Sequence, residues 1–438
     1  MKKILALVCL LGTLNLHAQG VETAKTAVAN MRLGWNLGNT LDSNSGDTKN
    51  MWIERWSNRT PKDYETAWGQ AQTTRDLIHM FKEAGFNAIR VPVTWYPHVG
   101  TLNNNGLTWD LSKWTGYAIN TVWMKRVKEI VDYVIDEGMY CILNVHHDTG
   151  TASTAWIKAD MDNYNQYSDR FEQLWKSIAT TFKDYGEHLL FEGYNEMTDK
   201  FGSWCFASFA GKNNYNATEA SNAYKAVNSY AQLFVDAVRS TGGNNAERNL
   251  IVNTYACCDG HGNWNSHLLD PLKQMALPED ATADHLIMQV HSYWDTNKYD
   301  ASMRTEITTS MNNLKTYLMK PNDVPVIIGE WGSSSEGANY TKLCEFAKFY
   351  SEKAKSLGIG TFYWMGLSDG NDRAVPKWTQ PELVEAIAKG YYGEPGYVNA
   401  VQNIKGDEPN ASYTLTGIKL GGNKSRLIVK KGRKYLSD

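Results

Sequence analysis

Cysteine is scarce in this chain, with 6 in 438 residues. Cys9 lies in an apolar N-terminal stretch, which leaves five in the remainder: Cys141, Cys205, Cys257, Cys258 and Cys344. Because five is odd, at least one thiol stays free or pairs with another chain. The adjacent Cys257 and Cys258 could form a strained disulfide or remain two thiols. Nothing in the cysteine spacing indicates a metal framework, and we expect neither a metal nor another cofactor.

Net charge is also small, at −3, with a pI near 6.4. The chain therefore offers no basic stripe for nucleic acid and no polybasic signal for a membrane surface. We expect neither of these as a partner.

Long apolar runs are missing except at the start. Met1-Lys2-Lys3, the apolar stretch Ile4–Leu16 and then His17-Ala18 match the basic start, apolar middle and small-residue end of a secretory signal. The stretch is too short for a membrane span, and no later segment is long enough. We expect residues 1–18 to be a signal peptide cleaved near Ala18, and the protein to be secreted or held at a bacterial cell surface.

Aromatic residues, by contrast, are abundant, with 16 Trp and 24 Tyr. Their flat rings can stack on the apolar faces of sugars, although many could equally pack in a core. A polysaccharide is therefore the partner that the composition favours. We expect the protein to act as a monomer.

Short apolar strands alternate with amphipathic helical stretches along the chain, which predicts a parallel sheet with right-handed crossovers. Eight such units favour an α/β fold, the closed (β/α)8 TIM barrel, over an open sheet. The predicted strands are 31–40, 86–91, 140–145, 189–191, 249–253, 286–290, 326–329 and 360–364. The predicted helices are 73–84, 123–137, 171–185, 223–239, 340–357 and 381–389.

The chain divides after the barrel. We assign residues 19–392 to the barrel domain and 393–412 to a linker bearing Gly, Pro and Asn. Residues 413–438 form a short C-terminal segment, in which 413–418 and 426–429 alternate like two strands. The basic end, Lys430 to Lys434, is expected to be a solvated tail.

Two glutamates follow predicted strands, Glu196 after 189–191 and Glu330 after 326–329. Catalytic groups of such barrels lie at the carboxyl ends of the strands. Cleavage of a glycosidic bond requires one carboxylic acid to protonate the leaving oxygen and one carboxylate on the opposite face. Either glutamate alone could be a solvated strand-end residue, but the pair predicts glycoside hydrolysis. For the retaining reaction we expect their carboxyls to lie roughly 5 to 5.5 Å apart.

Other polar and aromatic side chains follow the remaining strands. Arg90 could hold a carboxylate ionised or form a structural ion pair, and His291 and Tyr293 share one face of their strand. Trp35 and Asn36 point to a substrate rim, although Trp35 could equally lie in the core. His146, His147 and Asp148 are of zinc-ligand type, but neighbouring residues on a strand face opposite ways, so we favour hydrogen bonding over metal.

These residues make the chain resemble glycoside hydrolase family five, a family of retaining barrel hydrolases that includes endo-β-1,4-glucanases. The resemblance covers about residues 31–389 and rests on the motifs Gly34–Asp42, Phe86–Val93, Asn144–His147, Asn195–Glu196, His291–Tyr293, Gly329–Glu330 and Trp364. It implies that Glu196 is the acid/base and Glu330 the nucleophile, without a catalytic metal. It places around the cleaved bond Arg90, His146, Asn195, His291, Tyr293 and Trp364, with His147 beside them.

The sequence departs from the family pattern at Met197, where proline often follows the acid/base, and at Gln70, where asparagine is usual. Both positions border the cleft, so they bear on the substrate. We expect an endo-acting β-1,4-glucanase, with mannan, xyloglucan or xylan as alternative substrates. Two other classes remain open: a carbohydrate-binding barrel without catalysis, and a metal-dependent hydrolase. The C-terminal segment resembles sorting segments of secreted Bacteroidetes proteins.

Overall fold

The computed structural model describes residues 21–102, 109–209, 215–335, 337–394, 427–430 and 433–436. The predicted signal peptide, nearly all of the predicted linker and the predicted strand 413–418 lie outside these ranges, so those assignments remain predictions.

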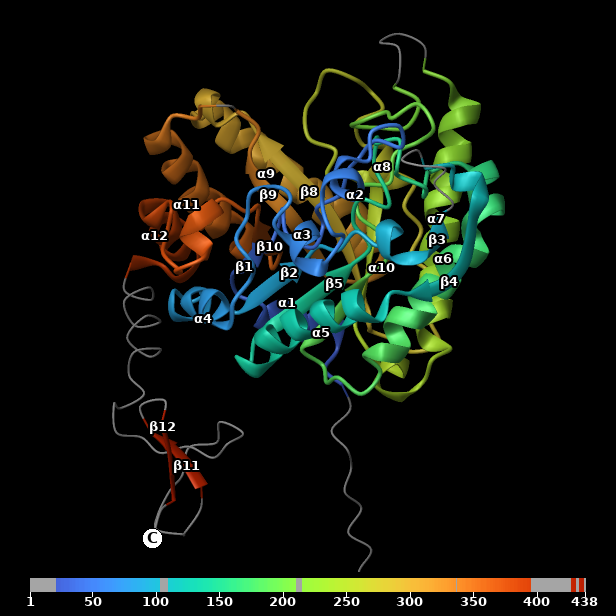
Figure 1. Ribbon diagram of the computed structural model, residues 1–438. Helices are drawn as coiled ribbons and strands as arrows, with labels where there is room; N and C mark the ends of the chain where they lie inside the picture. Colours follow the sequence, from blue (N-terminus) through green and yellow to red (C-terminus); the bar gives the residue numbers. More distant parts are fainter. Residues whose placement is uncertain are drawn as a thin grey trace, which may run out of the picture.

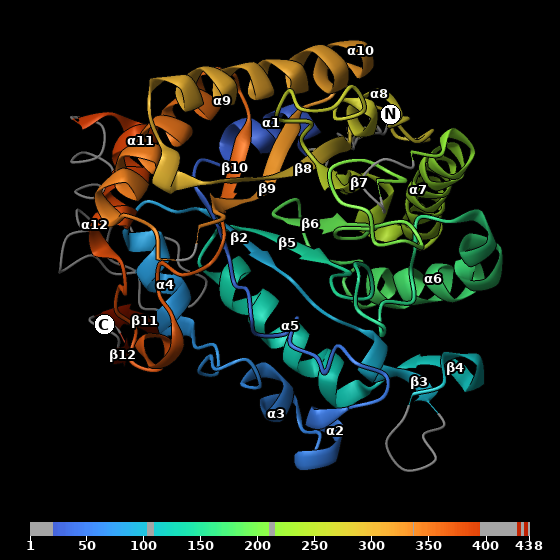
Figure 2. The same ribbon diagram turned by 90° about the horizontal axis from the view of Figure 1, so that it is seen from above.

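Eight parallel strands close into a barrel, which confirms the predicted fold, and helices surround the ring of strands (Figure 2). In order around the ring the strands are β1 (Gly34–Asn36), β10 (Gly360–Tyr363), β9 (Val326–Ser333), β8 (Leu286–Trp294), β7 (Leu250–Cys258), β6 (Leu189–Glu192), β5 (Tyr140–Asn144) and β2 (Ala88–Val91). The strands β7, β8 and β9 run further toward their carboxyl ends than the sequence predicted. Their extensions carry polar residues, which hide a strand from an apolar pattern.

The interior of the barrel at the amino-terminal ends of the strands is one apolar cluster, to which seven of the strands contribute. Because alternate strand residues face opposite sides, these side chains point inward while their neighbours pack against the helices. The strand members of the cluster are Ala88, Tyr140, Ile142, Leu190, Ile251, Ile287, Ile327 and Phe362. Helix α1 (Ala24–Asn30), which the sequence analysis did not predict, adds Ala24, Ala27 and Val28 and covers this end.

Six longer helices lie where the sequence predicted them: α4 (Arg75–Glu83), α5 (Thr121–Asp136), α6 (Met161–Thr181), α7 (Ala217–Arg239), α11 (Tyr340–Ser356) and α12 (Pro381–Tyr392). Figure 1 shows them on the outside of the sheet. Two begin earlier than predicted because their first turns are polar and carry no apolar period. Asp160 caps α6, and Asn216 caps α7, each accepting two backbone N–H bonds.

One long helix escaped prediction, α9 (Ala301–Leu314). Its sequence is rich in Thr, Ser and Asn, which are weak helix formers, so its helical signal is poor. Shorter helices are α2 (Trp52–Trp56), α3 (Pro61–Glu65), α8 (Asp270–Lys273) and α10 (Lys320–Asn322), the last preceded by a π-helical turn at Lys315–Met319.

Two hairpins lie outside the barrel sheet. β3 (Val99–Leu102) pairs with β4 (Trp114–Ile119), where the guanidinium of Arg170 from α6 stacks on Trp114 at 3.8 Å. β11 (Leu427–Lys430) falls on a predicted strand, but its partner is β12 (Arg433–Leu436), part of the stretch that we expected to be a solvated tail. Within the described ranges no helix is long and apolar enough to cross a bilayer.

Candidate active site

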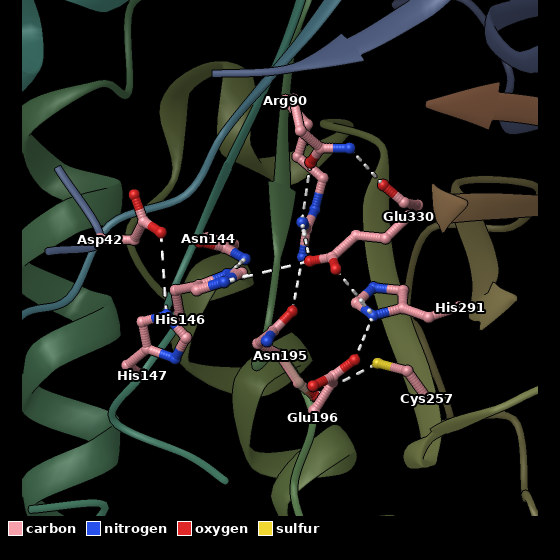
Figure 3. A network of polar contacts seen from close by, with 12 residues as sticks. Asp42, Arg90, Asn144, His146, His147, Asn195, Glu196, Cys257, His291 and Glu330 are labelled. Atoms are coloured by element: carbon pink, nitrogen blue, oxygen red, sulfur yellow. Dashed lines mark hydrogen bonds and ion pairs between the residues drawn. The ribbon is translucent and has the colours of Figure 1, made fainter. Parts of the chain in front are cut away.

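A polar layer follows the apolar interior in the direction of the carboxyl ends of the strands. Moving two residues along a strand returns to the same face, so the residues after the apolar cluster also point into the barrel. This layer comprises Asn36, Arg90, Asn144, Glu192, Asn253 and Gln289, each fully buried. We call this layer the floor of the site, and Figure 3 shows two of its members, Arg90 and Asn144, close to the predicted catalytic residue Glu330.

Arg90 is the centre of this floor. Its guanidinium donates to both oxygens of Glu192, at 2.6 and 2.7 Å, and to Oε1 of Glu330 at 2.7 Å. It also donates to the side-chain oxygens of Asn36, at 2.9 Å, and Asn195, at 2.7 Å. Arg90 is therefore a positioning residue for two carboxylates, in line with the two roles, holding a carboxylate ionised or forming a structural ion pair, that its position in the sequence suggested.

Glu192 is the functional residue that the sequence analysis missed. Besides Arg90 it accepts from the amides of Asn144, at 3.2 Å, and Asn253, at 3.0 Å. Although burial raises the pKa of Glu192, the charge of Arg90 and its hydrogen bonds outweigh burial and hold this pKa below its usual value. A charged residue two positions beyond buried Leu190, on the same strand face, was the signal that could have identified it.

Glu330 is held at both oxygens. Arg90 donates to Oε1, and the hydroxyl of Tyr293 donates to Oε2 at 2.7 Å. Burial raises the pKa of Glu330 above its usual value, while the charges of His291 and Arg90 and the bond from Tyr293 oppose that rise. Arg90 and Tyr293 thus both favour the charged form of Glu330, and burial acts against them.

The strand before Glu330 must approach its neighbour closely. A Cβ on Gly329 would lie 2.3 Å from the side-chain Cδ of buried Gln289, so only glycine fits there. An irregularity in the register between Val290 and His291 then sets His291 opposite Glu330. The close approach at Gly329 and the shifted register together place the ring of His291 next to Glu330.

Glu196 follows β6 and faces the opening more than Glu330 does, with 24% of its side chain exposed against 6%. Nδ1 of His291 lies 2.8 Å from Oε1 of Glu196 and 3.5 Å from Oε2 of Glu330. One oxygen of each glutamate and a ring nitrogen of His291 all lie within 4.8 Å of one another. His291 thus contacts both carboxylates.

Two further predicted residues flank Glu330. Nε2 of His146 lies 3.9 Å from its Oε1, and the His146 ring is parallel to that of half-buried Trp364, with centroids 5.8 Å apart. Burial lowers the pKa of His146 well below its usual value, so the ring is neutral. His147, a third of it exposed, lies 3.7 Å from Asp42.

The residues that could bind a metal beside His146 and His147 differ from those that the sequence suggested. Asp148 turns away from the two histidines and accepts from the backbone N–H of Trp95, at 2.8 Å, and from the indole of Trp156, at 2.7 Å. Asp42 takes its place beside His146 and His147, with one donor atom of each within 4.8 Å. His146, His147 and Asp148, the alternative metal set that the sequence left open, are therefore not brought together.

Two predictions for the substrate rim are wrong. Trp35 is fully buried; its ring stacks on Phe81 at 3.8 Å and its indole donates to the backbone of Met365. Asn36 is fully buried, and its side-chain amide donates to the backbone oxygens of Gly329 and Phe362. Both hold β1 in place, Trp35 from outside the barrel and Asn36 from inside.

The cysteines of the described residues are free thiols, including Cys257 and Cys258. Cys257 is buried beside the site and donates to the backbone oxygen of Asn195 at 3.4 Å.

A parallel barrel with two glutamates facing each other at the carboxyl ends of its strands is the arrangement of a glycoside hydrolase. Residues 49–369 match the family model described as Cellulase (glycosyl hydrolase family 5). The chain therefore belongs to glycoside hydrolase family 5, as its motifs indicated.

Relatives agree with this membership. Endoglucanase B of Neocallimastix patriciarum is 33% identical, over 84% of this chain and 72% of that protein, and Endoglucanase A of Ruminococcus albus is 32% identical, over 83% and 92%. A solved broad specificity endoglucanase from an uncultured bacterium is 50% identical, over 86% of this chain and 98% of that one, with a TM-score of 0.77. A family 5 enzyme from Prevotella bryantii, solved with a xyloglucan tetradecasaccharide, is 40% identical over 84% and 99%, with a TM-score of 0.71.

Proposed function

We propose that the chain is a secreted, monomeric endo-β-1,4-glucanase that acts by a retaining double displacement. The substrate class rests on the relatives, which are named endoglucanases. Secretion rests on the N-terminal sequence.

One observation carries the retaining mechanism: a carboxylate oxygen of Glu196 and one of Glu330 lie within 4.8 Å of each other. Retaining enzymes hold their carboxyls about 5 to 5.5 Å apart, whereas inverting enzymes leave about 6.5 to 9.5 Å for a water molecule. An oxygen pair this close fits the retaining separation better than the inverting one, which favours direct attack by one carboxylate.

The different surroundings of Glu330 and Glu196 indicate which of them is the nucleophile and which is the acid/base. Glu330 is the more buried and has both oxygens oriented by Arg90 and Tyr293, which suits a nucleophile that must attack one carbon in a fixed direction. Glu196 lies nearer the opening, where a leaving oxygen departs, and protonates it. Once the sugar is bound to Glu330, that carboxylate has lost its charge, and Glu196 can take a proton from water.

The remaining site residues contact the sugar or hold those that do. His146 and His147 lie on a different side of Glu330 from His291 (Figure 3), and the ring of Trp364 lies parallel to that of His146. We assign these three residues to the sugar that becomes covalently bound. Asn195, whose side-chain oxygen is bound to Arg90, has its amide available for a sugar hydroxyl. Arg90 and Asn36 act from beneath, without touching substrate.

Xyloglucan is the second candidate substrate, because the Prevotella bryantii relative was solved with a xyloglucan oligosaccharide. A polysaccharide panel separates the candidates. We expect β-1,4-glucan to be cut internally, so that its viscosity falls before short sugars accumulate, and mannan and xylan to be cut more slowly. Release of single sugars from chain ends, or no turnover of any polysaccharide, would refute the endoglucanase and favour an exo-enzyme or a binding protein.

A further inference from the structure

Backbone strain is concentrated in two segments beside Glu196. Eight non-glycine residues of the described chain have positive φ, and four of them lie here: Cys205 (68°), Ser208 (60°), Ala256 (49°) and Cys257 (54°). Left-handed conformations of such residues are unfavourable and persist only where the surroundings enforce them, commonly at functional sites. The first segment, 203–208, follows Glu196, and the second, 255–258, ends β7.

The two segments are bonded to each other. The hydroxyl of Tyr255 donates to the backbone oxygen of Ser203, at 2.8 Å, and accepts from the N–H of Asp199, at 3.0 Å. The carboxylate of Asp199 in turn accepts from the backbone N–H of Ser208 at 2.7 Å. Residues 203–208 are therefore joined to the end of β7 directly at Ser203 and indirectly, through Asp199, at Ser208.

A cavity of about 210 Å³ lies where the segments meet. Glu196 and His291 line it on the catalytic side, and the half-exposed indoles of Trp204 and Trp264 line it on the outer side. Because the proposed acid/base borders it, this cavity lies on the side of the leaving group.

Three cysteines line this same cavity: exposed Cys205, buried Cys257 and partly buried Cys258. Cys205 comes from the first segment and Cys258 from the second, so the two side chains border one small cavity from the two segments that Tyr255 joins. The bond that the Cys258 thiol donates to the backbone oxygen of Ala256 is long, at 3.8 Å, and we expect side-chain rotation at Cys205 and Cys258 to bring the two sulfurs together. Cys257, although adjacent to Cys258, is buried and turned to the backbone of Asn195.

We propose that Cys205 and Cys258 are a redox-active pair that closes to a disulfide across the wall of this cavity. The oxidant is a disulfide compound: one thiolate attacks it to give a mixed disulfide, and the second thiolate displaces the other half. An S–S bond forms between the cysteines, two electrons and two protons pass to the oxidant, and the oxidant leaves as two thiols. The bond would fix the segment that carries Trp204 against β7.

Oxidation should be slow at neutral pH. Burial raises the pKa of both thiols, and only the thiolate attacks a disulfide, so the rate should increase as the pH rises. That Trp204 would contact the leaving-group sugars rests on the proposed function. The formation of the S–S bond does not depend on that function.

The test incubates the purified, full chain with oxidised glutathione at alkaline pH and reads intact mass, linked peptides and the thermal midpoint. We expect a mass lower by two hydrogen atoms and a link between the peptides of residues 205 and 258. The midpoint should rise by about 5 °C, because the bond closes a long stretch of chain. No substrate is involved, so failure here is separate from failure of the proposed hydrolase activity.

Three variants keep the result unambiguous. Cys205→Ser and Cys258→Ser should each abolish the link and the rise in midpoint, whereas Cys257→Ser, the matched neighbour, should retain both. A link between Cys257 and Cys258, glutathione adducts without an internal link, or thiols that all remain free after prolonged oxidation would each overturn the proposal.

Discussion

One cation organises two carboxylates in this site. Arg90 has no exposed surface, and its guanidinium reaches Glu192 with two bonds and Glu330 with one. A single guanidinium cannot neutralise both acids, which is why burial still raises the pKa of Glu330 while that of Glu192 is lowered. Tyr293 supplies the remaining support for the charged form of Glu330.

This division predicts the pH dependence of Tyr293→Phe. Glu330 must be ionised to attack, so kcat/KM falls as the pH decreases through its pKa. The hydroxyl of Tyr293 lowers that pKa, and its loss should move the acid limb of kcat/KM to higher pH by about one unit, the value of a hydrogen bond to a charged group. The basic limb serves as the internal control. An acid limb that stays in place would mean that another group sets it.

For single residues, the sequence predicted the side chains that surround the proposed cleavage point but not all of the buried residues that hold them in place. Glu196, Glu330, His291 and Tyr293 were predicted, and the structure brings them together. Glu192 was missed and Asn36 was misassigned because strand alternation was not followed inward from the apolar layer. Only the closed ring shows that positions from six strands form one buried floor.

Strand alternation also explains two tryptophans that look alike in sequence. Trp35 on β1 faces outward and is enclosed by Phe81 of α4, with the guanidinium of Arg373 5.0 Å above its ring. Trp364, directly after β10, faces the cleft, where its ring covers the backbone of Gly38 and lies parallel to His146. One is part of the core and the other belongs to the site.

We therefore expect opposite effects from alanine at these positions. Trp35→Ala should lower the free energy of unfolding by about 3 to 5 kcal/mol and leave kcat/KM of the folded fraction nearly unchanged. Trp364→Ala should lower kcat/KM about tenfold through loss of stacking on the sugar, with a smaller change in stability. Denaturant unfolding and initial rates measure both. A Trp35→Ala enzyme that is stable but inactive would contradict the assignment.

The predictability of the elements depended on their apolar pattern. Continuous buried runs such as Leu189–Phe191 gave strands at the right place, and amphipathic stretches gave the helices. Elements without that signal were missed: polar α9, the β3–β4 hairpin and α1, whose short apolar face is explained only by the open end of the barrel that it covers.

For the whole molecule, the barrel brings together two groups of metal-ligand type that are distant in sequence. One consists of Asp42, His146 and His147, and the other of Glu196, His291 and Glu330. A cation in the second group would occupy both carboxylates that the proposed reaction uses. We therefore expect prolonged treatment with a chelator to leave turnover unchanged. Loss of activity that added zinc restores would show that the histidines hold a catalytic metal.

The central claim is that one glutamate protonates and the other attacks, as the closed barrel places them. Azide distinguishes these roles by the configuration of its product. In the acid/base variant azide attacks the covalent intermediate and the configuration is retained, whereas in the nucleophile variant no covalent intermediate forms and a single attack by azide inverts it. The test uses a β-glucoside whose leaving group departs without protonation.

The deciding measurement is the anomeric configuration, by NMR, of the glycosyl azide that each alanine variant forms on this substrate. For Glu196→Ala we predict residual turnover that azide accelerates, with a product of retained configuration, because the covalent intermediate on Glu330 still forms. Glu330→Ala should give no retained product. A retained azide from Glu330→Ala, with Glu196→Ala inert, would contradict the account and exchange the two roles.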